Sequence, residues 1–164
     1  MKQGDPISAL LFIAVMEECL GTLKAKWFKA NRRRNLHPFG IAVDSLQETL
    51  TNLRFADDVL ILAQSRADVS KMLRDLQKEA AKYGLRLNLD KTKILSRYCV
   101  SEGDAGVHVG VSMVEVLGPE ATEKYLGRKI CISWFHGTEV KHRIALGWAS
   151  FMKFKQELCG KHTS

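Results

Sequence analysis

A pair of adjacent aspartates within a short apolar stretch is the sequence feature that most restricts the fold. Apolar residues lie on both sides of Asp57 and Asp58, namely Leu53, Phe55, Val59, Ile61 and Leu62. Aspartate is a favoured turn residue, and the flanking apolar residues are typical of strands. The pattern therefore predicts a tight β-hairpin with two carboxylates at its tip. The pair alone leaves two explanations open: an acidic turn that keeps a hairpin soluble, or oxygen ligands for a hard cation such as Mg²⁺.

Two amphipathic helices are predicted around this hairpin. Asp5 and Pro6 suit the N-cap and first positions of a helix over about residues 6–27, with apolar residues at helical spacing: Ile7, Leu10, Leu11, Ala14 and Val15. Ser65 and Asp68 resemble a capping box. The helix that follows has an apolar stripe and should end at Gly84; the stripe is Val69, Met72, Leu73, Leu76 and Ala80.

The remaining segments predict short strands and a closing helix. Residues 39–43 and 46–50 suggest two strands, and Leu85, Leu87 and Leu89 alternate with polar residues as in a half-buried strand. Residues 101–110 resemble a loop, and residues 111–117 and 124–134 are expected to be strands. A helix of about five turns should begin near residue 138, with apolar positions Val140, Ile144, Trp148, Phe151 and Leu158. This order predicts an α+β fold with an antiparallel sheet packed on helices.

Length and composition place the chain among globular proteins. It has 164 residues, of which 46% are hydrophobic, and this is enough for a core. The longest apolar run, residues 9–16, is far shorter than the roughly 20 residues of a membrane helix, and no charged leader precedes it. We therefore expect a soluble, intracellular chain without membrane contact, either nuclear or cytoplasmic. The four cysteines lack zinc-site spacing, which favours reduced, partly buried thiols.

A basic stretch dominates the charge distribution. The net charge is +7, and no acidic residue lies between Glu18 and Asp44. The stretch between them contains Trp27 and Phe28 and these cations: Lys24, Lys26, Lys29, Arg32, Arg33 and Arg34. Cations and aromatic rings together can bind phosphates and stack on bases. The alternative is a solvated helix end that continues into a basic loop.

Four motifs in a fixed order resemble those of reverse transcriptases, most closely the enzymes of non-LTR, LINE-like retrotransposons. They are KQGDPIS at residues 2–8, FADD at residues 55–58, GLRLN with KTK at residues 84–93, and YLG at residues 125–127. The resemblance covers residues 1–127. It implies that residues 1–135 form part of the polymerase palm and that residues 136–164 form a helix connecting palm to thumb.

This resemblance implies an RNA-directed DNA polymerase. Such an enzyme transfers nucleotides from deoxynucleoside triphosphates to a DNA primer on an RNA template with the help of two Mg²⁺ ions. Asp57 would be a metal ligand and Asp58 its partner in the catalytic pair. Lys91 matches a lysine near the leaving pyrophosphate, where it could neutralise charge or deliver a proton. Without the resemblance Lys91 is a surface lysine, and Lys93 is close enough to be confused with it.

The resemblance also assigns substrate-binding residues. Gln3 and Gly4 would line the pocket for template and incoming nucleotide, while Phe55 and Ala56 belong to the catalytic hairpin near the primer terminus. Tyr125, Leu126 and Gly127 are similar to a strand turn that supports the primer end. Taken alone, these residues are equally compatible with a helix-entry loop, strand packing and core.

One departure from the family pattern concerns an earlier strand that carries a further essential aspartate. That strand and the fingers would precede Met1, and neither Asp5 nor Asp44 matches the aspartate's position. We therefore expect residues 1–164 to be inactive alone. The alternative is a non-catalytic nucleic-acid-binding remnant of a retrotransposon.

Overall fold

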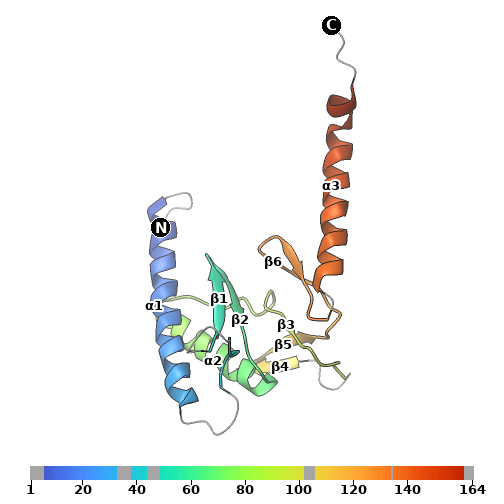
Figure 1. The fold of residues 1–164 in the computed structure, drawn as a ribbon. Coiled ribbons are helices and arrows are strands. Elements are labelled where there is room, and N and C mark those ends of the chain that lie inside the picture. Colours follow the sequence, from blue (N-terminus) through green and yellow to red (C-terminus); the bar gives the residue numbers. More distant parts are fainter. Residues whose placement is uncertain (1–5, 33–37, 44–48, 102–105, 134, 161–164) are drawn as a thin grey trace. The chain divides into compact units, whose positions relative to one another are not determined.

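The computed structural model describes residues 6–32, 38–43, 49–101, 106–133 and 135–160 (Figure 1). In chain order its elements are α1 (Pro6–Asn31), β1 (Asn52–Phe55), β2 (Asp58–Ile61), α2 (Arg66–Ala81), β3 (Ile94–Leu95), β4 (Gly106–Val109), β5 (Ser112–Leu117), β6 (Glu123–Tyr125), β7 (Arg128–Ile130) and α3 (Phe135–Cys159). The fold is α+β, as predicted.

The chain divides into two compact units, which are described separately. The first contains Met1–Ile94 and Asp104–Val116, and the second contains Leu95–Gly103 and Leu117–Ser164. Within the described residues the strands form three small sheets: β1-β2, β3-β5-β4 and β6-β7. The pairs β1-β2, β4-β5 and β6-β7 are antiparallel. The predicted antiparallel pairing is present, although it is distributed over these separate sheets.

The core of the first unit lies between α1 and α2. The second half of α1 buries one face, on which Met16, Cys19, Leu20, Leu23 and Trp27 recur at helical spacing. They pack with Phe39 and with an apolar stripe of α2, namely Met72, Leu76 and Ala80. Fully burying one such large side chain contributes roughly 1.5–3 kcal/mol, so this cluster holds the two helices together.

Both ends of α2 follow the prediction. The Oγ of Ser65 accepts a hydrogen bond from the backbone N–H of Asp68 at 3.1 Å, as an N-cap does. At the other end, the N–H of Leu85 donates to the carbonyl of Ala80 at 3.0 Å, and that of Gly84 to Ala81 at 3.1 Å. Gly84 has φ +72°, the left-handed conformation with which such Schellman closures end a helix.

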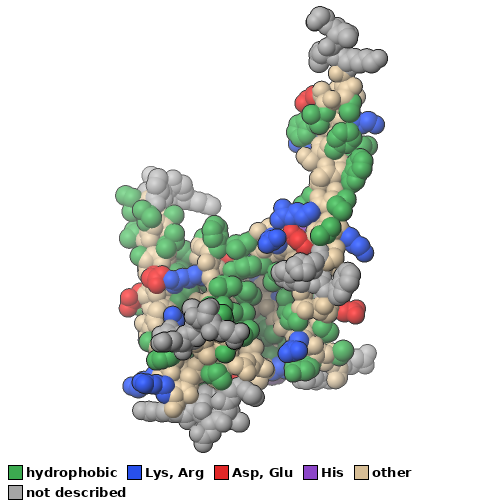
Figure 2. Space-filling view, in the orientation of Figure 1, with side chains coloured by type: hydrophobic (Ala, Val, Ile, Leu, Met, Phe, Trp, Pro, Cys, Tyr) green, Lys and Arg blue, Asp and Glu red, His purple; other side chains and the backbone are tan. Residues whose placement is uncertain are grey.

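The apolar residues at the start of α1 do not have the predicted role. Although the helix begins at Pro6 as expected, Ile7, Leu10 and Leu11 are 61%, 68% and 49% exposed. The buried stripe starts only at Met16, where α2 comes alongside the helix. Figure 2 shows hydrophobic side chains at the surface of this first half of α1 and along α3.

Several predicted strands differ from the structure. Residues 39–43 contribute one antiparallel bridge, between Ile41 and Leu50, and most of the second predicted strand lies outside the described residues. Leu85, Leu87 and Leu89 alternate in burial as expected, but residues 85–89 form no strand, because no neighbouring segment supplies ladder hydrogen bonds within the described chain.

Other segments are more regular than predicted. The predicted loop at residues 101–110 contains β4, which pairs with β5 across a turn at Gly110, while part of that loop is not described. Where one strand was predicted over residues 124–134, residues 123–130 form the hairpin β6-β7, because Leu126 and Gly127 adopt a tight turn. The closing helix α3 begins at Phe135 rather than near residue 138.

None of the four cysteines is in a disulfide bond, and Cys19 and Cys131 are buried while Cys99 and Cys159 are exposed. Among the described helices, none has both the length and the apolar character needed to cross a membrane.

Candidate functional site

The hairpin β1-β2 carries the aspartate pair at its tip. Phe55 lies opposite Asp58 in the register, so Ala56 and Asp57 are the two turn residues. Ala56 has φ +52° and Asp57 has no positive φ, which is the pattern of a type II′ hairpin turn. Glycine usually occupies that first position, because a side chain there is strained. The predicted hairpin is therefore confirmed, with Asp58 as the first residue of β2.

The base of the hairpin is anchored, whereas its tip is open. Val59 and Ile61 pack against the core cluster. Arg54 donates to the carbonyl oxygen of Met16 at 3.4 Å and forms an ion pair with Glu17, so it ties β1 to α1. Phe55 on the opposite face is 65% exposed. The strands thus hold the tip from one side and leave the other side free for a ligand.

The two carboxylates at the tip are accessible. Asp57 and Asp58 are exposed, and their side chains make no hydrogen bond or ion pair with the described residues. Mg²⁺ is commonly bound through one or two carboxylates together with substrate phosphates and water, which fits this donor set. Over the ranges that the structure describes, no group of three His, Cys, Asp or Glu side chains could hold a metal ion.

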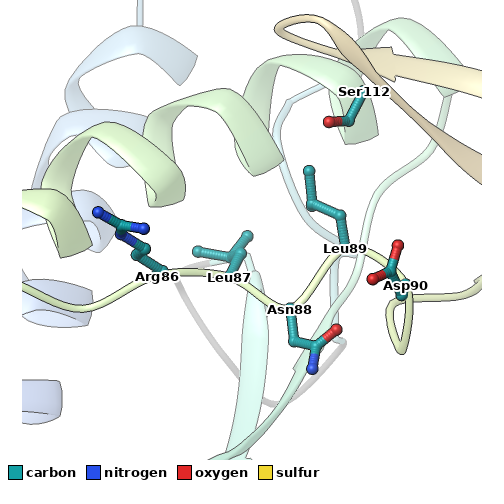
Figure 3. Close-up of a pocket in the computed structure, with 6 residues that line it drawn as sticks. All are labelled: Arg86, Leu87, Asn88, Leu89, Asp90 and Ser112. Carbon is teal, nitrogen blue, oxygen red and sulfur yellow. The ribbon is translucent and has the colours of Figure 1, made fainter.

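The segment after α2 borders an open depression of about 520 Å³ in the first unit. Figure 3 shows Leu87 and Leu89 pointing to one side of this segment and Asn88 to the other. Asn88 Oδ1 accepts the backbone N–H of Lys91 at 3.2 Å, and its carbonyl accepts the Thr92 hydroxyl at 2.8 Å. These bonds fix the turn on which Lys91 lies.

The two lysines of the KTK motif have different environments. Lys93 Nζ forms an ion pair with Glu115 at 2.5 Å, which holds it on β5. The Lys91 side chain is exposed and has no hydrogen-bonding or ionic partner within the described part of the chain. Of the two, Lys91 is therefore the cation available to a ligand.

Tyr125, Leu126 and Gly127 lie in the second unit, at the hairpin β6-β7. Tyr125 is opposite Arg128 in the register, and the two turn residues Leu126 and Gly127 have φ +50° and +76°. Positive φ at both positions defines a type I′ turn, which matches the twist of the strands it connects. Leu126 is 46% exposed at the tip.

The basic stretch of α1 is only partly available for binding. Trp27 is 1% exposed, and its indole N–H donates to Asp75 Oδ2 at 3.0 Å, so this ring cannot stack on bases. Lys26 Nζ donates to Asp75 Oδ1 at 2.7 Å. Burial acts to raise the Asp75 pKa, but these two hydrogen bonds and the charges of Lys26 and Lys71 leave it below the ordinary value.

The other cations of this stretch face solvent where they are described. Lys24, Lys29 and Arg32 are exposed, and the Arg32 guanidinium lies 6.0 Å from the centre of the Phe28 ring. Arg33, Arg34, Gln3 and Gly4 lie outside the described residues, as do Asp5 and Asp44. Their predicted roles remain predictions.

Three positions with clear structural roles escaped the sequence analysis. Asp75 joins α1 to α2, Arg54 joins the hairpin to α1, and Glu139 joins α3 to β7. Only Glu139 leaves a local signal, since it precedes Arg143 by four residues on a helix. The other two contacts connect residues that are distant in sequence.

Comparison with known proteins identifies the family. A family model described as reverse transcriptase (RNA-dependent DNA polymerase) matches residues 1–130. The chain belongs to the reverse transcriptase family. The matched region includes the hairpins β1-β2, β4-β5 and β6-β7, α2 and the KTK motif.

Two relatives illustrate the extent of the similarity. A transposon-derived protein of Caenorhabditis elegans is 34% identical over 102 residues, which are 62% of this chain and 36% of that protein. The retrovirus-related Pol polyprotein of the type-2 retrotransposable element R2DM of Drosophila melanogaster is 29% identical over 134 residues, 77% of this chain and 11% of the polyprotein. The matched region is thus a minor part of each relative.

Proposed function

We propose that this reverse transcriptase segment contributes the Asp57 and Asp58 carboxylates to the polymerase site of a non-LTR retrotransposon enzyme. The observation that carries the proposal is the exposed aspartate pair on an anchored hairpin, within the residues that match the family. Residues 1–135 would be part of the palm and residues 136–164 the start of the thumb. The partners would be an RNA template, a DNA primer and deoxynucleoside triphosphates.

Each site residue would have its own role. Asp57 and Asp58 would hold Mg²⁺, which when bound stabilises charge on the transferred phosphate. Lys91, with its free ammonium, would neutralise the leaving pyrophosphate or give it a proton. Phe55, Ala56 and the turn at Leu126 would contact the primer end, and Gln3 and Gly4 the nucleotide pocket.

A chimera tests the proposal. Residues 1–130 would replace the matching segment of the Drosophila polyprotein, and primer extension on an RNA template would be measured. We expect Asp57→Asn to abolish extension without unfolding the hairpin, because asparagine keeps shape and turn propensity but loses the charge that holds Mg²⁺. Equal extension by an active chimera and its Asp57→Asn variant would refute the metal assignment.

The isolated chain provides a second comparison. Asp57 and Asp58 come from one hairpin, whereas metal-dependent sites usually hold their ions from several elements, so we expect residues 1–164 alone to give no extension. A non-catalytic nucleic-acid-binding segment is the alternative, supported by the net charge of +7. Under that alternative the chimera would bind primer–template but would be as inactive as its Asp57→Asn variant. The parent polyprotein, measured as the positive control, would be active.

A further inference from the structure

Glu139 in the first turns of α3 contacts Lys129, Arg143 and Arg128. Its Oε2 accepts the backbone N–H of Lys129 on β7 at 2.7 Å, and its Oε1 accepts from Arg143 Nε at 2.7 Å. The Nε of Arg128 lies 3.7 Å from the same Oε1. The carboxylate is largely covered, with the side chain 13% exposed. All four residues belong to the second unit.

These contacts attach a short hairpin to a long helix. The strands β6 and β7 have three residues each, and a two-stranded hairpin of that size is marginally stable by itself. Glu139 is bonded both to the backbone of β7 and to a side chain on α3. It therefore fixes the direction in which the Leu126 turn and Arg128 point relative to α3.

The same contacts bring two arginines to Glu139. Arg128 and Arg143 each face Glu139 through Nε, and their side chains remain 67% and 58% exposed. Within the described residues their terminal guanidinium nitrogens have no partner. The hydrogen bond at Nε fixes the direction of the outer edge of the Arg143 guanidinium, whereas Arg128 is attracted to Glu139 by charge. The planar paired donors of both arginines suit phosphate oxygens. Lys124 and Lys129 on the same hairpin add positive charge.

We propose that Glu139 is a positioning residue that holds Arg143 by a hydrogen bond and Arg128 by an ion pair as a preorganised site for backbone phosphates of a nucleic-acid duplex. The inference rests on the proposed function in requiring a primer–template substrate. A carboxylate beside a phosphate site repels the phosphate. Glu139 can therefore favour phosphate binding only through the geometry that it imposes on the arginines.

This conflict between charge and geometry supplies the test. Removing any acidic residue makes the chain more positive and should tighten phosphate binding if charge alone matters. Glu157 is the matched control, since it lies on the same helix, is exposed and has no partner within the described residues. Glu139→Gln and Glu157→Gln change charge equally and keep side-chain size.

Binding of a fluorescein-labelled RNA–DNA hybrid to the full chain would be measured at about 0.1 M salt. We expect Glu157→Gln to bind equally or slightly more tightly, and Glu139→Gln to bind at least about threefold more weakly than Glu157→Gln. In a background of Arg128→Ala with Arg143→Ala, the Glu139→Gln effect should vanish, because Glu139 acts through those arginines. Circular dichroism would confirm that α3 is intact in each variant.

Each outcome decides the inference. If Glu139→Gln binds the hybrid as tightly as Glu157→Gln or more tightly, the inference is wrong. It is also wrong if Glu139→Gln still weakens binding in the background of Arg128→Ala with Arg143→Ala. Both outcomes leave the proposed function in place. If the wild type fails to bind the hybrid, both this site and the nucleic-acid part of the proposed function are wrong. The Asp57→Asn comparison in the chimera tests catalysis and does not depend on Glu139.

Discussion

The two lysines of the KTK motif, in the first unit, allow a catalytic role to be distinguished from a structural one. We predict that Lys91→Ala lowers the extension rate of the chimera by about 100-fold to 10,000-fold, the usual contribution of charge or proton assistance. Lys93→Ala is the matched control, because Lys93 is already paired with Glu115. The variant should lose an exposed ion pair, worth up to about 1 kcal/mol of stability, and keep most of the extension rate. Equal rate losses for both lysines would contradict the assignment.

Two glycines make a paired prediction about stability. Gly40 has φ +87°, and a Cβ there would lie 2.6 Å from the Leu50 carbonyl oxygen. We expect Gly40→Ala to lower the free energy of unfolding by about 2 kcal/mol. Gly21 lies within α1, and a Cβ there would meet nothing within 4 Å. Gly21→Ala should raise the free energy of unfolding by about 0.5–1 kcal/mol. Urea denaturation would measure both, and equal signs would contradict the structure.

At the scale of elements, the contact between α1 and α2 depends on one buried carboxylate. Asp75 accepts from Lys26 and from the Trp27 indole, and its pKa is lowered. We predict that Asp75→Asn lowers the free energy of unfolding by about 2 kcal/mol at neutral pH. The new amide N–H group would face Lys26 or the Trp27 indole, which are themselves hydrogen-bond donors. Asp90→Asn, at an exposed position, is the control with an equal charge change.

The same carboxylate predicts a pH dependence of the free energy of unfolding. A folded pKa below the unfolded value means that the stabilisation is fully present above the unfolded pKa, near 3.9, and is lost as pH falls through the lower folded pKa. The difference in the free energy of unfolding between wild type and Asp75→Asn should therefore shrink as the pH falls from the unfolded pKa through the folded pKa. If this difference in the free energy of unfolding stayed constant down to strongly acidic pH, the charge of Asp75 would not contribute to stability.

The elements also show how much the sequence could predict. Periodicity and local signals placed α1, α2 and the Asp57 hairpin, since caps, turn residues and apolar spacing are encoded within a few neighbouring residues. The same reasoning failed for residues 85–89, whose alternation was correct but whose strand requires a partner that spacing cannot reveal. It also failed for the start of α1, where burial depends on α2.

The candidate site shows the same contrast between residues found from local motifs and contacts that connect distant positions. The carboxylates and Lys91 were recognised from ordered motifs, and their exposure is now evident. The contacts that hold the site were missed, because Arg54 to Met16 and Lys26 to Asp75 connect positions 38 and 49 residues apart. Base stacking by Trp27 was one of the two explanations left open for the basic stretch, and the structure shows a core residue instead. Its position on the buried stripe of α1 could have indicated this.

At the scale of the whole molecule, charge is the property most directly linked to function. The net charge of +7 includes cations in both units, among them Lys24 and Lys29 on α1 and Arg128 and Arg143 beside Glu139. A surface of this kind attracts a polyanion from any direction and without sequence preference. Local contacts such as the Lys26 to Asp75 pair reduce the number of cations that can contribute.

The last prediction is that this attraction depends on salt and involves the three arginines at the end of the basic stretch, Arg32, Arg33 and Arg34. Each phosphate neutralised on a duplex adds about 0.9 to the negative slope of log affinity against log salt. We expect a clear negative slope for the full chain with an RNA–DNA hybrid. Reversing Arg32, Arg33 and Arg34 to glutamate should weaken binding and flatten the slope.

A matched variant separates this stretch from general charge. Reversal at Lys78, Arg86 and Arg97 changes the net charge equally at positions outside the basic stretch. If the three arginines contact phosphates, their reversal should reduce the slope by more than the control reversal, because only ions released at the contact enter the slope. A flat slope for the wild type, or equal effects of the two reversals, would remove Arg32, Arg33 and Arg34 from the nucleic-acid surface.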